Sequence, residues 1–122
     1  MQILIVKENF KDMDKLNKLS KEVFLPEEYL PPDYIIKMED FKLYALYDSN
    51  LFVGLMAIKI LKNMAYLFYL AIDSNYRSKG YGKQALEEFK KLNENYQLTL
   101  DIELIDEKAK NNEQRIKEKI FI

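Results

Sequence analysis

The chain has 122 residues, a length typical of one domain, so we expect a single domain over residues 1–122. Its 19 basic and 20 acidic residues leave a net charge of −1, which argues against a non-specific nucleic-acid binder. Histidine and cysteine are both absent. Their absence excludes disulfides, histidine-dependent triads, cysteine nucleophiles and zinc–thiolate sites, and we predict no metal site.

The longest apolar run covers residues 64–72, which is too short to cross a bilayer. The first residues, Met1 to Val6, contain no basic lead and no cleavage site of the kind that a signal peptide needs. We therefore expect a cytoplasmic protein that has neither a membrane nor a nucleic acid as its partner.

The first forty residues predict one strand and two helices. Residues 2–6 are typical of a short strand, and Asp12 can cap a helix that runs to about Glu22 with apolar residues at helical spacing. All three prolines fall within residues 25–32, which predicts a bend, and residues 33–38 suggest a short second helix.

Three strands are expected next, over residues 41–47, 51–61 and 64–72. The segments between them, 48–50 and 62–63, are polar and very short. Because so short a turn can only join antiparallel neighbours, these strands predict an antiparallel meander.

The remaining pattern is a polar loop over residues 73–79, a helix over 80–92, a strand over 98–104 and a last helix over about 106–120. Apolar and polar residues alternate along 98–104, as on a half-buried strand. The run from the third meander strand through the helix to this strand predicts one right-handed parallel crossover. The fold class is therefore α/β (α+β), a mixed sheet with helices on both faces.

The segment from Asn75 to Ala85 predicts an anion site. It holds two of the chain's three glycines between a strand and a helix. The first turn of a helix offers amide groups without intrahelical partners, and the helix dipole adds positive potential there. Glycine lets the backbone approach a ligand, and Arg77, Lys79 and Lys83 add cationic side chains. Together these features suit a pyrophosphate.

Two other interpretations of the same segment remain. One is a plain glycine turn before a helix, with its lysines in solvent. The other is a dinucleotide fingerprint, Gly80-x-Gly82-x-x-Ala85, with Asp101 or Glu103 about twenty residues later. The long loop before Gly80, the antiparallel meander and the single crossover all count against the dinucleotide fold.

With Arg77-x-x-Gly80-x-Gly82 in this context, the chain resembles the GNAT superfamily of N-acetyltransferases along its whole length. The resemblance implies a GNAT-like mixed sheet and acetyl-CoA bound in a splay between the two parallel strands. It implies that backbone amides hold the pyrophosphate and that the end of the third meander strand and the start of the last helix contact the pantetheine arm. The residues so implied are Leu70, Ala71, Ile72, Arg77, Ser78, Lys79, Gly80, Tyr81, Gly82, Lys83, Asn111 and Asn112. For the asparagine pair, ordinary helix-surface polarity is the alternative.

Acetyl transfer to an amine needs a base, because a free alkylammonium has a pKa of about 10. Glu103 is the preferred candidate and Asp101 the weaker one, since both lie on one face of the strand that would line the cleft. The family often places a carboxylate there. The alternative is that both belong to the solvent face of a half-buried strand.

The resemblance fails at the C-terminus. Phe121 and Ile122 align with a Phe-Tyr pair, so the tyrosine usually assigned as general acid is replaced, and the last two strands of the family are missing. The strand over 98–104 then has a bare edge, which predicts a homodimer through that edge. The expected function is acetyl-CoA-dependent N-acetyl transfer to an unknown amine, with loss of activity through truncation as one outcome. A non-catalytic CoA-binding protein or an oligomeric interaction protein is the alternative.

Overall fold

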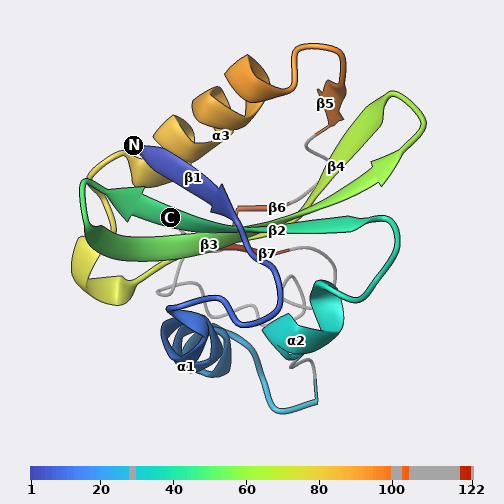
Figure 1. The fold of residues 1–122 in the computed structure, drawn as a ribbon. Coiled ribbons are helices and arrows are strands. Elements are labelled where there is room, and N and C mark those ends of the chain that lie inside the picture. Colours follow the sequence, from blue (N-terminus) through green and yellow to red (C-terminus); the bar gives the residue numbers. More distant parts are fainter. Residues whose placement is uncertain (28–29, 100–102, 105–118, 122) are drawn as a thin grey trace.

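The computed structural model describes residues 1–27, 30–99, 103–104 and 119–121, and it places one mixed sheet between helices on both of its faces (Figure 1). In chain order the elements are β1 (Gln2–Ile5), α1 (Met13–Val23), α2 (Pro32–Ile35), β2 (Phe41–Asp48), β3 (Leu51–Leu61), β4 (Met64–Ile72), the 3-10 helix η1 (Ser74–Tyr76), α3 (Tyr81–Leu92), β5 (Gln97–Thr99), β6 (Glu103–Leu104) and β7 (Lys119–Phe121). None of the helices in these residues is long and apolar enough to span a membrane.

Strands β1 to β4 form the predicted antiparallel meander. The bounds of β3 and β4 agree with the prediction to the residue, because turn residues interrupt the apolar runs at both ends. The predicted second helix is correct in place but ends early, at Ile35 instead of Met38.

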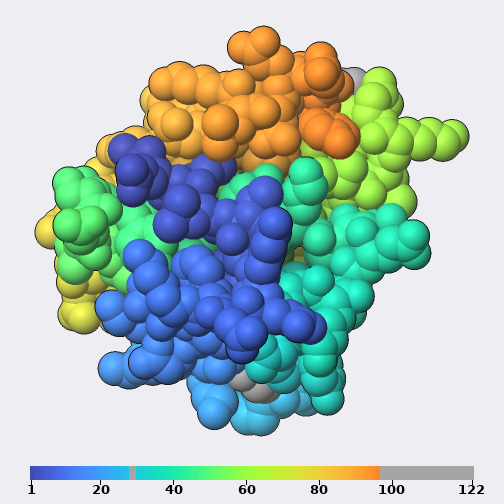
Figure 2. All heavy atoms as spheres, viewed as in Figure 1, coloured from blue at the N-terminus to red at the C-terminus, as the bar shows by residue number. Residues whose placement is uncertain are grey.

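Two hydrophobic cores lie on opposite faces of the sheet. Beneath the sheet in Figure 1, Leu16, Leu19 and Val23 of α1 pack against alternate residues of the meander. Above it, Ala85 and Phe89 of α3 pack against the residues that point the other way. Strands β2, β3 and β4 are therefore largely buried on both faces, as expected for a sheet covered by helices on both sides. In the space-filling view, α3 and α1 lie at opposite margins of one side of the molecule, with β1 between them (Figure 2).

A β-bulge interrupts β4 where the strand changes neighbours. Ile58 of β3 pairs with Leu67 and Ala57 pairs with Tyr69, so Phe68 has no opposite residue. Phe68 and Tyr69 consequently both belong to the core beneath the sheet. A bulge bends a strand and increases its twist, and this one separates the part of β4 that pairs with β5 from the part that pairs with β7.

The C-terminal part of the sheet differs from the prediction. Of the strand predicted over 98–104, the structure shows β5 paired with the start of β4, then β6 two positions away from β4. Strand β7 lies between β4 and β6 and is parallel to both. The predicted last helix is therefore wrong at Lys119 and Ile120, which are in a strand; residues 106–118 lie outside the described residues. The helix was predicted from the spacing of residues within the segment, and that spacing carries no information about the edges of β4 and β6 with which β7 pairs.

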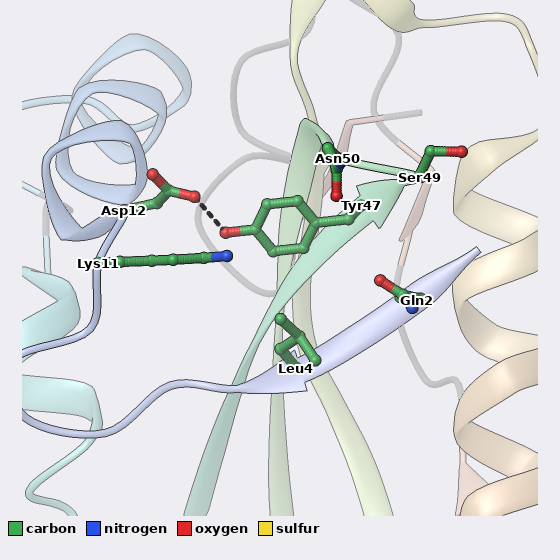
Figure 3. Close-up of a pocket in the computed structure, with 7 residues that line it drawn as sticks. All are labelled: Gln2, Leu4, Lys11, Asp12, Tyr47, Ser49 and Asn50. Carbon is green, nitrogen blue, oxygen red and sulfur yellow. Dashed lines mark hydrogen bonds between the residues drawn. The ribbon is translucent and has the colours of Figure 1, made fainter.

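A buried tyrosine fastens α1 to the sheet. The Tyr47 hydroxyl donates a hydrogen bond of 2.5 Å to Oδ2 of Asp12, the residue before α1 (Figure 3). The Lys11 ammonium lies 5.6 Å from the centre of the same ring. These residues line a hollow of about 180 Å³. Burial, followed by the hydrogen bond to Asp12 and its charge, raises the pKa of Tyr47 above its ordinary value of 10.0.

Replacement of Tyr47 by Phe should lower stability in a pH-dependent way. At pH 7 we expect the free energy of unfolding to fall by about 1.5–3 kcal/mol, the usual contribution of a hydrogen bond to a charged group. Because the pKa of Tyr47 is raised on folding, this contribution is complete below pH 10 and is lost as the pH rises above it. The wild type should therefore converge on Tyr47→Phe above pH 10 in urea unfolding, and Tyr34→Phe, at an exposed ring, is the control. Curves that stay parallel through pH 11 would contradict the proposed role.

Candidate cofactor site

Two hydrogen bonds of Asp73 hold the first residue of the loop after β4 in place. The Asp73 amide donates to the Val53 carbonyl oxygen at 2.8 Å, and the Asp73 carboxylate accepts a 2.9 Å hydrogen bond from the Asn75 amide. Asp73 thereby caps η1, which ends at Tyr76. The predicted polar loop is thus held close to the end of β4.

The backbone from Ser78 to Lys83 presents a row of free donors. Ser78 and Gly80 have positive φ angles, 66° and 82°, on either side of Lys79. Alternation in the sign of φ turns successive amides toward one side, which is the geometry of an anion-binding nest. Within the described part of the chain, no group accepts a hydrogen bond from the amides of residues 78–83. A serine held at positive φ is strained, and such strain is concentrated at functional sites.

Helix α3 begins at Tyr81, so the row includes its first turn. Gly80 is its N-cap, and the first bond of the helix runs from the Gln84 amide to the Gly80 carbonyl oxygen at 3.1 Å. The amides of residues 81–83 therefore point out of the helix end, where the dipole adds positive potential. The Tyr81 hydroxyl donates to Oδ2 of Asp48 at 2.6 Å, which ties this end to the β2–β3 turn. That hydrogen bond is the main reason that the pKa of Tyr81 is raised.

Arg77 braces the loop instead of pointing into open space. Its Nε donates to the carbonyl oxygen of Ile72, the last residue of β4, at 2.8 Å. Burial lowers the pKa of the guanidinium, and the charges of Asp73 and Glu22 act in the opposite direction. The side chain thus holds the loop against β4, while Lys83 is exposed and the Lys79 ammonium lies 5.8 Å from the centre of the Tyr76 ring.

A shallow hollow of about 240 Å³ adjoins this loop on the side of α1. Its polar lining carries both signs of charge: Lys15, Lys18, Glu22 and Asp73, with Tyr76 beside them. The described residues contain no group of three or more acidic side chains that could hold a metal ion.

The end of β4 is buried and closely packed. Leu70 and Ile72 face α3, Ala71 faces α1, and all three side chains are at most 1% exposed. A ligand could therefore contact this part of β4 only through backbone groups, on the edge that faces β7. On the other edge, an added Cβ at Gly54 of β3 would clash with the Ala71 carbonyl oxygen.

Gly54→Ala should therefore disturb the end of β4. Because the clash is with backbone, we expect a loss of about 1–3 kcal/mol in the free energy of unfolding, as for overpacked cores. In Gly80→Ala the new Cβ meets only Gln84 Nε2, at 3.9 Å, so the left-handed backbone alone should cost about 1 kcal/mol. Urea unfolding of both variants measures the difference. A Gly54→Ala protein as stable as the wild type would show that β3 and β4 lie further apart.

The candidate base, Glu103, is in register with the last part of β4. Glu103 of β6 pairs with Lys119 of β7, which in turn pairs with Tyr69 of β4. Asp101, Asn111 and Asn112 lie outside the described residues. The structure therefore brings together residues 70–83 and places Glu103 across β7 from them. Sequence reasoning missed the bulge at Phe68 and the Tyr81–Asp48 contact, because neither leaves a local pattern.

A comparison with protein-family models matches residues 10–116 to the acetyltransferase (GNAT) family. The chain belongs to the GNAT family. This confirms the resemblance stated above, and the mixed sheet with helices on both faces confirms the fold class. No curated protein matches the sequence.

Among solved structures, 115 chains match this GNAT protein. A protein of Bacteroides thetaiotaomicron, described as a GNAT-family acetyltransferase, has a TM-score of 0.71 and 20% identity over 95% of this chain and 67% of its own. An aminoglycoside 6'-N-acetyltransferase complexed with coenzyme A has a TM-score of 0.67 and 19% identity, covering 88% of this chain and 64% of its own. The PaiA N-acetyltransferase of Thermoplasma acidophilum, also with coenzyme A, has a TM-score of 0.58 and 20% identity over 77% and 73%. At these identities the likeness shows the fold alone.

Proposed function

We propose that this GNAT protein is an acetyl-CoA-dependent N-acetyltransferase. The observation that carries the proposal is the row of amide donors at residues 78–83, which leads into the positive end of α3. Family membership and the two coenzyme A complexes of similar fold support it.

The residues of the loop fit a pyrophosphate. Amide donors that have no acceptor among the described residues, a helix N-terminus and the cations of Lys79 and Lys83 suit a doubly charged diphosphate, which needs many hydrogen bonds. The positive φ at Ser78 and Gly80 turns these amides outward, and Arg77 fixes the loop from behind. The pantetheine arm would lie along the edge of Leu70, Ala71 and Ile72, with Asn111 or Asn112 as a further contact.

For the reaction itself we assign Glu103 as general base and Asp101 as the weaker candidate. Bound acetyl-CoA would supply the acetyl group as a thioester. The neutral amine nitrogen would bond to its carbonyl carbon, the carbon–sulfur bond would break, and the proton that the nitrogen loses on forming the amide would go to the departing sulfur to give the thiol. Glu103 would take the proton that the ammonium must lose before attack. Its backbone position, level with Tyr69 and near the end of β4, supports this role. No metal takes part in this scheme.

The test is a calorimetric titration of the chain with acetyl-CoA, followed by a panel of primary amines. Because the chain contains no cysteine, a thiol reagent detects released CoA with no background from the protein. Micromolar binding with amine-dependent thiol release would support the enzyme. Binding without release would favour a CoA-binding protein that does no chemistry, and no binding at millimolar ligand would refute both.

Two further expectations accompany this function. A cytoplasmic location is one. The other is a homodimer through the outer edge of β6, the last strand on that side of the described sheet. Both stay predictions.

A further inference from the structure

The edge of β4 assigned above to pantetheine has a partner in this chain. Tyr69, Leu70 and Ala71 pair in parallel with Lys119, Ile120 and Phe121 of β7. Two of these three β4 residues, Leu70 and Ala71, belong to the proposed pantetheine contact. In the sheet β7 lies between β4 and β6, and in Figure 1 it is largely hidden behind β2 and β3.

We propose that β7 is a built-in competitor of the cofactor, so that acetyl-CoA binds only when β7 leaves β4. This inference rests on the proposed function. A pantetheine arm carries amide groups and hydrogen-bonds to a strand edge as another strand would. One edge of β4 can pair with one partner at a time, since each outward amide and carbonyl there forms its ladder bond with a single neighbour.

The arrangement of the neighbouring strands supports the competition. The bulge at Phe68 turns β4 away from β5, and beyond it β6 lies two strand spacings, or about 10 Å, from β4. That opening is the splay expected from the family resemblance, and β7 fills it. Among the described residues, the ladder between β7 and β4 has three residue pairs and the ladder between β7 and β6 has two, so release of β7 breaks few pairs in this part of the sheet.

The competition predicts a measurable loss of affinity. When a site is available for only a fraction of the time, its apparent dissociation constant rises by the inverse of that fraction. If β7 were docked for nine-tenths of the time, the constant for acetyl-CoA would rise about tenfold. A substitution that displaces β7 from β4 should lower the apparent dissociation constant by the same factor.

Ile120→Pro is the variant of choice. Strand β7 has neighbours on both sides, so every amide in it faces β4 or β6, and a proline at the middle position is incompatible with the ladder. Ile120→Val keeps the amide and the branched side chain and is the matched control. Calorimetry should give about tenfold tighter acetyl-CoA binding for Ile120→Pro and wild-type affinity for Ile120→Val.

Hydrogen exchange on the unaltered chain provides a second measurement that does not depend on how the variant folds. On saturation with acetyl-CoA, amides of residues 119–121 should exchange faster, while those of residues 69–71 stay protected by the new ligand. Equal affinities of wild type and Ile120→Pro, with unchanged exchange at 119–121, would overturn the competition and leave the proposed function intact. Absence of binding to every variant would overturn the proposed function and the competition together.

Discussion

Gly82→Asp should abolish acetyl-CoA binding, with a loss of at least about a hundredfold in affinity. Gly82 is buried in the first turn of α3, within the row of free amides at residues 78–83. A carboxylate there would lie against a bound pyrophosphate and would also offer the amides an internal acceptor. Like charges brought together at a binding interface cost several kcal/mol, and a hundredfold corresponds to about 2.8 kcal/mol.

The matched control for this variant is Gln84→Asp. It adds the same charge to the same turn of the helix, at an exposed residue whose amide already donates to the Gly80 carbonyl oxygen. Long-range repulsion of the pyrophosphate is then nearly equal in the two variants. A difference in their affinity for acetyl-CoA therefore measures the local contact at residue 82. A cooperative urea-unfolding transition is the check that Gly82→Asp is folded. Equal affinities of the two variants would show that the pyrophosphate does not bind at this loop.

The sequence predicted the meander and α3 well because each element is decided locally. Residues 51–61 and 64–72 are apolar runs between turn residues, and Ala85 and Phe89 lie at helical spacing after two glycines. The loop at residues 77–83 was predicted for a similar reason, because its glycines and cationic residues are close together in the sequence.

Contacts between distant segments could not be predicted in the same way. The bulge at Phe68 depends on how β3 and β4 align, and Phe68 itself looks like any residue of an apolar strand. The role of Arg77 is another example. From the sequence it was expected to be a cation for the phosphate, but in the structure its Nε donates a hydrogen bond to the Ile72 carbonyl oxygen. The pairing of β7 is the extreme case. The segment around Ile120 becomes a strand only because β4 and β6 present edges to it on both sides.

The same placement of β7 bears on catalysis. Glu103 is level with Tyr69 but separated from β4 by the width of one strand, and that width is the space that pantetheine would fill. Where pantetheine replaces β7 between β4 and β6, the backbone of Glu103 would lie one strand spacing from the arm. A base positioned in this way should act on the amine and contribute nothing to the affinity for the cofactor.

Glu103→Gln should therefore lower kcat about a hundredfold, a typical effect of losing a general base, with the dissociation constant of acetyl-CoA unchanged. Without the base, the reaction depends on amine that is already deprotonated in solution. Below an amine pKa of about 10 that fraction rises tenfold per pH unit, so the rate of the variant should rise about as steeply. The wild type should show a shallower dependence. Glu87→Gln, which removes an exposed carboxylate of α3, is the control and is expected to stay within about threefold of the wild type. A Glu103→Gln enzyme with wild-type kcat and pH profile would place Glu103 on the solvent face of its strand, and the proton would then have to leave through another group.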